Sequence, residues 1–302
     1  MIKKVAVLYI ALGRYKIFWK DFFESSEKFL LQCDKHYFIW TDCAPEEIEY
    51  AGKDNVTITY AQKKGWPYDT LFRFEMFLQK EKELSQFDYI FFCNANLLFY
   101  NPTDLSEIAP AEWHDGLVGG LHPGNKFNIP GSTFNNPDRF SYERRPESTA
   151  YIPFGKGRNY LCGAFNGGTA AAYLQMCRTL SENVKIDLEK NIVACVDDES
   201  HLNAYVVDKN YLLAGRAYLF PEGAVRRIPK VQRKMIKIVS RTKDSPKWGG
   251  TEWLRGATDR KIPQDNLLTQ ILRLLFLIIA CLVPNRQIRK KIRSLYGKRN
   301  VI

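Results

Sequence analysis

The first hundred residues alternate between two hydrophobic periodicities, and this alternation constrains the fold more than any other feature of the chain. Apolar runs of strand length occupy residues 3–11, 37–42, 56–60 and 89–93. Residues 18–30 and 70–84 instead show the 3.6-residue period of amphipathic helices. Strands that alternate with helices predict an α/β protein with a mostly parallel central sheet and helices on both faces. The 302 residues are enough to bury a substantial core around such a sheet.

Residues 117–168 differ from the first hundred residues in composition and periodicity. They are rich in Gly, Pro, Asn and aromatic residues and contain few periodic runs. An irregular stretch of this length inside a compact domain is usually functional. Helical periodicity returns in residues 173–180 and 199–207, and the pattern of a folded domain ends near Arg255.

The formal charge of +11 is concentrated near the C-terminus. Residues 286–302 contain seven basic residues and no acid, so they carry +7 of the +11. The rest of the chain is close to balanced, and we therefore expect no nucleic-acid partner. The seven cysteines are odd in number and form no CxxC pair, and the N-terminus lacks the pattern of a signal peptide. These features predict reduced thiols and a cytoplasmic location.

An apolar run precedes this basic cluster. Residues 274–283 carry no charge, Arg273 stands before them and Pro284 ends the run. A membrane-spanning helix needs about 20 apolar residues, so this run is too short to span. We expect an amphipathic helix in the plane of the inner leaflet, because each basic residue near an anionic surface contributes about 1 kcal/mol. The alternatives are a core or dimer helix followed by a disordered basic end, and nucleic-acid binding through the tail.

Two amides flank an alanine where the strand at residues 89–93 ends, in the order Asn94, Ala95 and Asn96. In an open α/β sheet, ligands bind outside the carboxyl ends of the strands, so these residues are well placed to contact one. Nucleotide-sugar transferases usually have Asp-x-Asp at this point and hold a divalent ion with it. An amide is a neutral and weak metal ligand, so a diphosphate here would need another source of positive charge. The alternative is an ordinary strand end.

Three consecutive acids, Asp197, Asp198 and Glu199, precede His201. A metal site is disfavoured, because residues two apart such as Glu199 and His201 do not face each other on a helix. The aspartates could instead cap the helix that follows, since Asp accepts hydrogen bonds from the free N–H groups of a helix N-terminus. A carboxylate in that position is also stabilised in its ionised form, so it could act as a nucleophile or hold sugar hydroxyls.

Four stretches appear in the following order within residues 3–255: Leu121-His122-Pro123-Gly124, Ser141-Tyr142-Glu143-Arg144-Arg145-Pro146, Ala150-Tyr151-Ile152-Pro153 and Asp198-Glu199-Ser200-His201-Leu202-Asn203. Together they resemble glycosyltransferase family six, the family of the blood-group A and B transferases and the α-1,3-galactosyltransferase. Bacterial members with Asn-Ala-Asn in place of Asp-Val-Asp resemble the chain further. The resemblance implies a GT-A fold and a retaining, metal-independent transfer of galactose or N-acetylgalactosamine from UDP, in α-1,3 linkage, to a galactoside.

The resemblance also implies domain limits and residue roles. The catalytic domain would span residues 1–256, with a UDP-binding half at about 1–100 and an acceptor-binding half at about 101–256, and the tail would span 257–302. Glu199 would be the catalytic carboxylate beneath the anomeric carbon and would also contact the acceptor, as would His122 and Ser141. The implied donor-binding residues are Ile10, Ala11, Leu12, Tyr15, Trp66, Arg73, Asn94, Ala95, Asn96, Cys162, Gly163, Ala164, Asp198 and Lys243.

Two departures from the family pattern bear on specificity. Val196 and Asp197 stand where vertebrate members have Trp-His, which changes acceptor recognition. Ala164 occupies the last position of the donor-discriminating triplet, where alanine is associated with galactose and glycine leaves room for an N-acetyl group. We expect a UDP-sugar donor and no divalent-metal cofactor. The acceptor would be an oligosaccharide or a lipid-linked glycan, either fucosylated or plain. The alternative is a catalytically silent protein that binds a sugar nucleotide or a glycan.

Overall fold

The computed structural model describes residues 2–124, 136–245 and 247–258. These residues belong to one compact unit, Met1–Asp259. No helix in these ranges is long and apolar enough to cross a membrane. The expected amphipathic helix and the basic cluster lie outside the described residues, so the membrane-associated tail stays a prediction.

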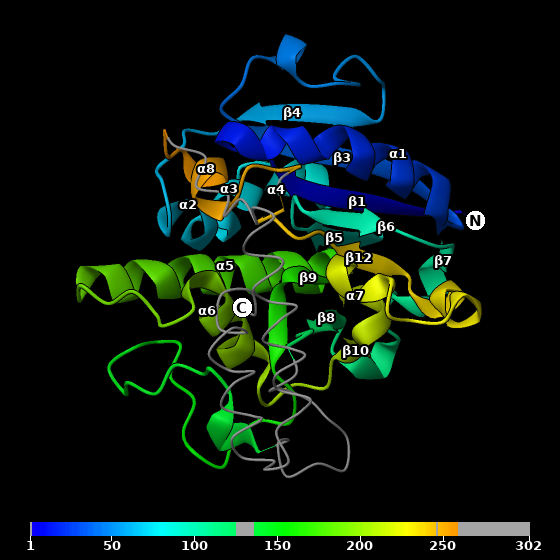
Figure 1. Ribbon diagram of the computed structural model, residues 1–302. Helices are drawn as coiled ribbons and strands as arrows, with labels where there is room; N and C mark the ends of the chain where they lie inside the picture. The colour runs from blue at the N-terminus through cyan, green and yellow to red at the C-terminus, as the bar shows by residue number, and fades with distance from the viewer. Residues whose placement is uncertain (1, 125–135, 246, 259–302) are drawn as a thin grey trace, which may run out of the picture. The chain divides into compact units, whose positions relative to one another are not determined.

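Seven strands form the central sheet, in the order β10-β8-β9-β5-β1-β3-β4. Their bounds are β1 (Lys3–Ile10), β3 (Cys33–Thr41), β4 (Val56–Tyr60), β5 (Tyr89–Cys93), β8 (Leu117–Leu121), β9 (Leu161–Thr169) and β10 (Leu212–Ala214). Strand β9 pairs antiparallel with β5 and β8, and the other neighbouring pairs are parallel. The predicted mostly parallel sheet is confirmed (Figure 1).

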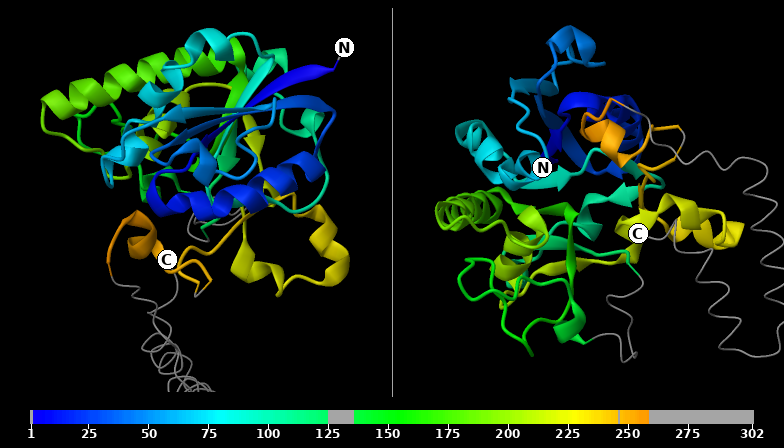
Figure 2. Two further views of the ribbon diagram at one scale, coloured as in Figure 1. Left: turned by 90° about the horizontal axis from the view of Figure 1, so that it is seen from above. Right: turned by 60° about the vertical axis from the view of Figure 1, so that its left-hand side comes forward.

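Helices cover both faces of this sheet, as the sequence predicts. Alternate residues of β1 point to opposite sides, so Val5, Val7 and Tyr9 pack with α1 (Trp19–Phe29). Ala6 and Leu8 pack into a second core with α3 (Arg73–Leu78), α5 (Ala170–Glu189) and α6 (Asp197–Val206). Figure 2 shows α1 and α5 on opposite sides of the strands. The two cores hold the strand ends rigidly, which suits a site that depends on fixed geometry.

Shorter elements complete the described part of the chain. Two small sheets flank the main one: β6 pairs with β12, which also pairs with β11, and β2 pairs with β7. The remaining bounds are β2 (Leu30–Leu31), β6 (Leu97–Phe99), β7 (Thr103–Asp104), β11 (Phe220–Pro221), β12 (Ile238–Ser240), α2 (Tyr68–Leu71), α4 (Glu81–Leu84), α7 (Glu222–Val225), α8 (Thr251–Arg255), η1 (Gly13–Phe18), η2 (Pro45–Glu47), η3 (Leu105–Glu107), η4 (Glu112–His114), η5 (Pro137–Arg139), η6 (Arg216–Tyr218) and η7 (Lys230–Met235).

The helix expected at residues 70–84 is not continuous. It is divided into α2, α3 and α4, because the backbone leaves helical geometry at Phe72 (ψ 6°) and at Lys80 (φ −115°, ψ 21°). One residue separates α2 from α3, and two residues separate α3 from α4. Hydrophobic periodicity therefore detects the helical stretch but not its interruptions.

The stretch expected to be irregular, residues 117–168, contains strands β8 and most of β9. Glycines hide both strands from a pattern search, because they have neither β-propensity nor hydrophobic alternation. Glycine is needed at these positions because the backbones approach each other closely. A Cβ on Gly168 would lie 2.2 Å from the Gly116 carbonyl oxygen. A Cβ on Gly167 would lie 2.5 Å from the carbonyl oxygen of Ile90 on β5. Central strands can thus read as loops when they pack this tightly.

Candidate active site

A cleft of about 240 Å³ lies at the carboxyl ends of β1 and β5, beside the first residues of β9. The N-terminus of α6, the residues around α2 and the helix α8 form its other walls. This is the position at which open α/β sheets bind their ligands. The cleft brings together these residues named from the sequence: Ile10, Leu12, Tyr15, Trp66, Arg73, Asn94, Cys162, Gly163, Ala164, Asp198, Glu199 and Lys243.

Five other residues named from the sequence, Ala11, Ala95, Asn96, His122 and Ser141, do not line this cleft. Its walls also contain residues that were not named as site residues: Lys63, Asp69, Thr70, Phe92, Val196, Asp197, Leu254 and Arg255. Lys63, Asp69 and Thr70 flank Trp66 and Arg73 in sequence, so proximity could have suggested them. Leu254 and Arg255 have no local signal, because tertiary packing brings α8 to the cleft.

Arg73 is the buried cation at the base of the cleft. Its Nη1 lies 2.7 Å from Asp198 Oδ2 and donates to the carbonyl oxygen of Gly163 at 2.8 Å. The guanidinium carbon lies 4.7 Å from the Phe92 ring centre, so an aromatic wall fixes its plane. Its Nε and Nη2 atoms are buried and have no hydrogen-bond partner among the described residues. Such buried donors are costly to leave unpaired.

Glu199 lies beside this ion pair on the first turn of α6. The backbone N–H of Gly163 donates to Glu199 Oε2 at 2.6 Å. Burial raises the pKa of Glu199, whereas that hydrogen bond, those with Tyr160 and Cys162, and the charge of Arg73 oppose the rise. Gly163 thus contacts both acids, since a Cβ there would lie 3.0 Å from Asp198 Oδ2 and 3.5 Å from Glu199 Cβ. A glycine here lets β9 pass close to the two carboxylates.

The rest of this acidic motif is structural. Ser200 Oγ accepts from the backbone N–H of Val196 at 3.0 Å and so closes the first turn of α6. Asn203 binds β9 twice, accepting from the Leu161 N–H at 2.9 Å and donating to the Leu161 carbonyl oxygen at 2.9 Å. His201 is buried with its Nε2 3.8 Å from Asp187 Oδ2. His201 is outside the cleft lining, so the structure gives no support to a metal site built on Glu199 and His201.

The motif at residues 142–145 fixes the chain that leads into α6. Glu143 accepts from the Nε and Nη2 atoms of Arg145 at 2.9 and 2.6 Å, and from the backbone N–H of Cys195 at 2.8 Å. Arg145 also donates to the carbonyl oxygen of Val193. These bonds lower the pKa of Glu143 to about 2. Ser141, next to this network, is exposed. The motif therefore positions the acids at 197–199 rather than contacting the cleft.

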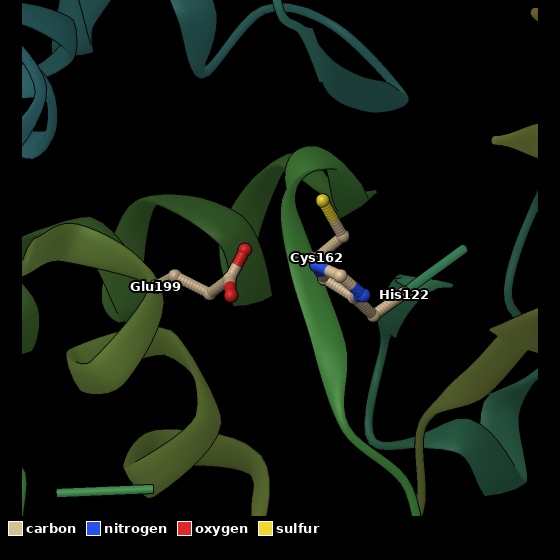
Figure 3. A group of neighbouring side chains, drawn as sticks. All are labelled: His122, Cys162 and Glu199. Atoms are coloured by element: carbon tan, nitrogen blue, oxygen red, sulfur yellow. The ribbon is translucent and has the colours of Figure 1, made fainter. Parts of the chain in front are cut away.

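His122, Cys162 and Glu199 form a group whose possible metal-ligating atoms lie within 4.8 Å of one another. Figure 3 shows the His122 ring and the Glu199 carboxylate pointing toward each other. The backbone N–H of Gly124 donates to His122 Nδ1 at 3.0 Å, which puts the proton of the neutral ring on Nε2. A metal-bound histidine normally donates from its second nitrogen, and here that nitrogen accepts. The group suits hydrogen bonding to a polar ligand better than metal binding.

The two amides of the Asn-Ala-Asn stretch point to different places. Asn94 lines the cleft, and its Oδ1 accepts from the backbone N–H of Ala95 at 3.0 Å. The carbonyl oxygen of Ala95 accepts from the Tyr9 hydroxyl inside the core. Asn96 Nδ2 donates to the Arg241 carbonyl oxygen at 2.8 Å and to Ser240 Oγ at 3.2 Å. The pair therefore does not present two side-chain oxygens to one point, as a shared divalent ion would require.

Cations gather at the mouth of the cleft. Lys243 Nζ lies 5.2 Å from the centre of the Tyr15 ring, and burial together with Arg255 lowers the pKa of Lys243. The Arg255 guanidinium stacks 4.5 Å from the Trp66 ring, and Lys63 donates to the Arg255 carbonyl oxygen. With Arg73 at the base, these groups favour an anionic ligand.

Sequence comparison identifies the family of the chain. A profile of glycosyltransferase family 6 matches residues 3–247, most of the chain. The chain belongs to glycosyltransferase family 6. Members of this family act on a nucleotide-sugar donor and a glycan acceptor, and the protein is thus a glycosyltransferase.

Several curated proteins are similar to the chain. The O-antigen biosynthesis glycosyltransferase WbnI of Escherichia coli is 32% identical over 82% of this chain and 97% of its own length. The histo-blood group ABO system transferase 2 of Rattus norvegicus is 28% identical over 67% of this chain and 59% of its own length. The globoside alpha-1,3-N-acetylgalactosaminyltransferase 1 of Gallus gallus is 28% identical over 72% and 62%. The match thus covers nearly the whole bacterial relative but less than two thirds of the two vertebrate ones.

Proposed function

We propose that the protein is a GT-A-type, retaining hexosyltransferase. It moves galactose or N-acetylgalactosamine from UDP, in α-1,3 linkage, to a galactoside acceptor, which is a fucosylated or plain oligosaccharide or a lipid-linked glycan. Family membership supports the reaction class, and the printed names of the ABO and globoside relatives point to the sugar and the linkage. The observation that carries the proposal is the pair of Asp198 and Glu199 at the base of a cleft with a cationic mouth.

Each acid has a distinct role in this proposal. Retention by double displacement needs a nucleophile on the face of the anomeric carbon opposite the leaving group. Glu199 acts there as that nucleophile or, in a front-face reaction, as an ion-pair partner. Asp198, held by Arg73, accepts hydrogen bonds from donor-sugar hydroxyls. The diphosphate lies next to the sugar in this proposal, where Arg73 and Lys243 stabilise the negative charge that grows as UDP leaves. A phosphate oxygen of the departing UDP then accepts the proton of the acceptor hydroxyl.

Replacing the proposed nucleophile tests this function. Glu199→Gln keeps the size of the side chain but removes its charge, so we expect transfer from either UDP-sugar to fall by about 10²-fold or more. Glu182→Gln, at an exposed position on α5, is the matched control and should keep wild-type turnover. Unchanged turnover of Glu199→Gln would exclude its assigned role. A wild-type chain that binds UDP-sugars without transferring or hydrolysing them would favour the silent binding protein.

The same assay addresses donor choice. Ala164 lines the cleft two residues from Cys162. In this proposal its methyl group would crowd an N-acetyl substituent of the donor sugar. A difference of this size is worth about 1–3 kcal/mol, so we expect kcat/KM to favour UDP-galactose modestly over UDP-N-acetylgalactosamine. A strong preference for UDP-N-acetylgalactosamine would refute this assignment.

We also propose that transfer needs no divalent metal. The support is the donor set: Asn94 and Asn96 are neutral, and only Asn94 lines the cleft. Enzyme treated with EDTA should keep its rate, while a family member with Asp-Val-Asp serves as the control that chelation is effective. A large loss that Mn²⁺ restores would show that the amides still serve a metal.

A further inference from the structure

Asn96 is buried, with 5% of its surface exposed, and its side chain acts on the peptide chain rather than on the cleft. Its Nδ2 donates to the Arg241 carbonyl oxygen at 2.8 Å and to Ser240 Oγ at 3.2 Å. The backbone carbonyl oxygen of Asn96 accepts from the backbone N–H of Arg241 at 2.8 Å. Strands β6 and β12 pair as far as Leu97 and Ser240, so Asn96 extends this ladder by one residue with a side-chain bond.

The contacts of Asn96 require an amide at this position. Both of its partners, a carbonyl oxygen and a hydroxyl oxygen, accept from Nδ2, while Oδ1 is buried without a hydrogen-bond partner among the described residues. A carboxylate has no N–H to offer and would oppose the Arg241 carbonyl oxygen with a buried negative charge. An aspartate, the residue that holds a metal in Asp-x-Asp enzymes, is therefore incompatible with this contact.

The segment that Asn96 holds leads directly to Lys243, two residues beyond Arg241. The Arg241 side chain is fixed as well, because its Nη1 lies 2.7 Å from Asp21 Oδ2 and its guanidinium stacks on Phe18 and Trp248. On the other side of the lysine, the Gly250 N–H donates to the Lys243 carbonyl oxygen at 3.2 Å. The backbone on both sides of Lys243 is thus anchored, and Lys243 lines the cleft with its Nζ 5.2 Å from the centre of the Tyr15 ring.

We propose that Asn96 is a positioning residue for Lys243. The inference rests on the proposed function, in which Lys243 stabilises the charge on departing UDP. The second amide of the Asn-Ala-Asn stretch then does not replace a metal ligand with a weaker one. It fixes the chain that carries the lysine, and the lysine supplies the positive charge. The Asn96 amide and the Lys243 cation therefore act together, and replacing either one alone should lower kcat.

A double-mutant cycle tests this coupling. Asn96→Ala should lower kcat by about tenfold or more with little change in the KM for the donor, since misplacing a catalytic group by about 1 Å costs up to about 10²-fold. Lys243→Ala should lower kcat at least as much. In the Lys243→Ala background, Asn96→Ala should cause no further loss, because the group that it positions is gone. A purely structural role for Asn96 would add its loss in both backgrounds.

Asn101 offers a matched control. Its Nδ2 also clamps two carbonyl oxygens, those of Arg233 at 2.8 Å and Ile236 at 2.7 Å, but upstream of β12 and away from the cleft. Asn101→Ala should cost melting temperature without coupling to Lys243. If Asn96→Ala fails to fold, Ser240→Ala replaces it in the cycle, because it removes only the 3.2 Å bond. Its smaller loss of kcat should likewise vanish in the Lys243→Ala background.

The results separate this inference from the proposed function. A wild-type chain without transferase activity refutes the function itself. With an active wild type, losses that add in the double variant, or wild-type kcat in both Asn96→Ala and Ser240→Ala, overturn the positioning role. Asn96→Asp should also lose activity, and Mn²⁺ should not restore it. Turnover of Asn96→Asp that depends on Mn²⁺ would show that residue 96 can reach a metal at the donor and would overturn the inference.

Discussion

Three consecutive carboxylates share the first turn of α6, yet each has a different environment. Asp198 pairs with Arg73, and Glu199 accepts from the Gly163 N–H. Asp197 has a positive φ of 42° and lies next to the charge of Asp198. Burial and that neighbouring charge raise the pKa of Asp197 to about 6, against a partial opposing effect of Arg255. The charge of Asp197 therefore changes close to neutral pH.

Removing the charge of Asp197 should stabilise the protein at neutral pH. Because its pKa is raised in the folded state, its favourable contribution is complete below the unfolded value of 3.8 and is lost as pH rises through about 6. We expect Asp197→Asn to melt at a higher temperature than wild type at pH 7–8, with the difference vanishing near pH 4. Asp54→Asn, at an exposed position, is the control. A difference that does not vary with pH would contradict the assigned cause.

The residues of the cleft were predictable to different degrees. Asp198, Glu199 and Arg73 belong to stretches whose residue types are unusual together, so a resemblance could point to them. Arg255 could not be found in this way. Its helix α8 reaches the cleft through tertiary contacts, such as the bonds from Arg14 Nη1 to the carbonyl oxygens of Trp253 and Ala257, both at 2.7 Å. Local sequence contains no information about contacts between residues that are 239 and 243 positions apart.

At the scale of elements, the approach to α6 depends on one buried carboxylate. Glu143 joins the loop at residues 142–145 to Cys195, immediately before the turn that carries the acids. Adjacent arginines beside acids are often part of a solvated loop, and beside glycine-rich stretches they could equally line a cleft. The structure shows a third arrangement, in which Arg145 neutralises Glu143 while the glutamate binds backbone N–H groups of both segments.

Glu143→Gln should weaken the contacts between the loop at residues 142–145 and the segment before α6. The pKa of Glu143 is lowered to about 2, so its contribution to stability is present above the unfolded value of 4.5 and is lost as pH falls toward about 2. We expect a lower melting temperature than wild type at pH 7 and a smaller difference at pH 3. Turnover should fall as well, because the start of α6 shifts. Glu147→Gln, exposed in the same loop, should change neither property. Equal melting temperatures at pH 7 would contradict the role.

The elements themselves were predicted where periodicity is strong and missed where packing overrides it. Strands β1, β3, β4 and β5 follow from apolar runs, and α1 from its helical period. Strands β8 and β9 did not, because the sheet uses glycine at positions such as Gly167, where a Cβ would meet the backbone of β5. The length of α5 was also underestimated: it spans Ala170–Glu189 against an expected 173–180. A residue's intrinsic preference predicts its secondary structure only where packing does not override it. At the glycines of β8 and β9, the close approach of neighbouring strands determines which residue fits.

At the scale of the whole molecule, charge divides the chain into two parts. The described cleft mixes acids and cations, whereas residues 286–302 carry seven positive charges and lie outside the described residues. The cleft nevertheless depends on residues close to that tail, because Leu254 and Arg255 line it and the Ala257 carbonyl oxygen accepts from Arg14. A truncation that separates catalysis from any membrane contact must therefore spare everything up to residue 258.

A cut after Asp265 meets this condition and tests the tail. The shortened chain should keep wild-type activity on a short soluble acceptor, since every described residue that lines the cleft remains. The full chain should bind anionic vesicles, and binding should weaken as salt screens the basic cluster. Activity on a lipid-linked acceptor should fall in the shortened chain. It should also fall in a full-length triple variant, Arg289→Glu with Lys290→Glu and Lys291→Glu, which keeps the apolar run. A full chain that ignores anionic vesicles, or that resists extraction by high salt and carbonate, would contradict reversible association through the tail.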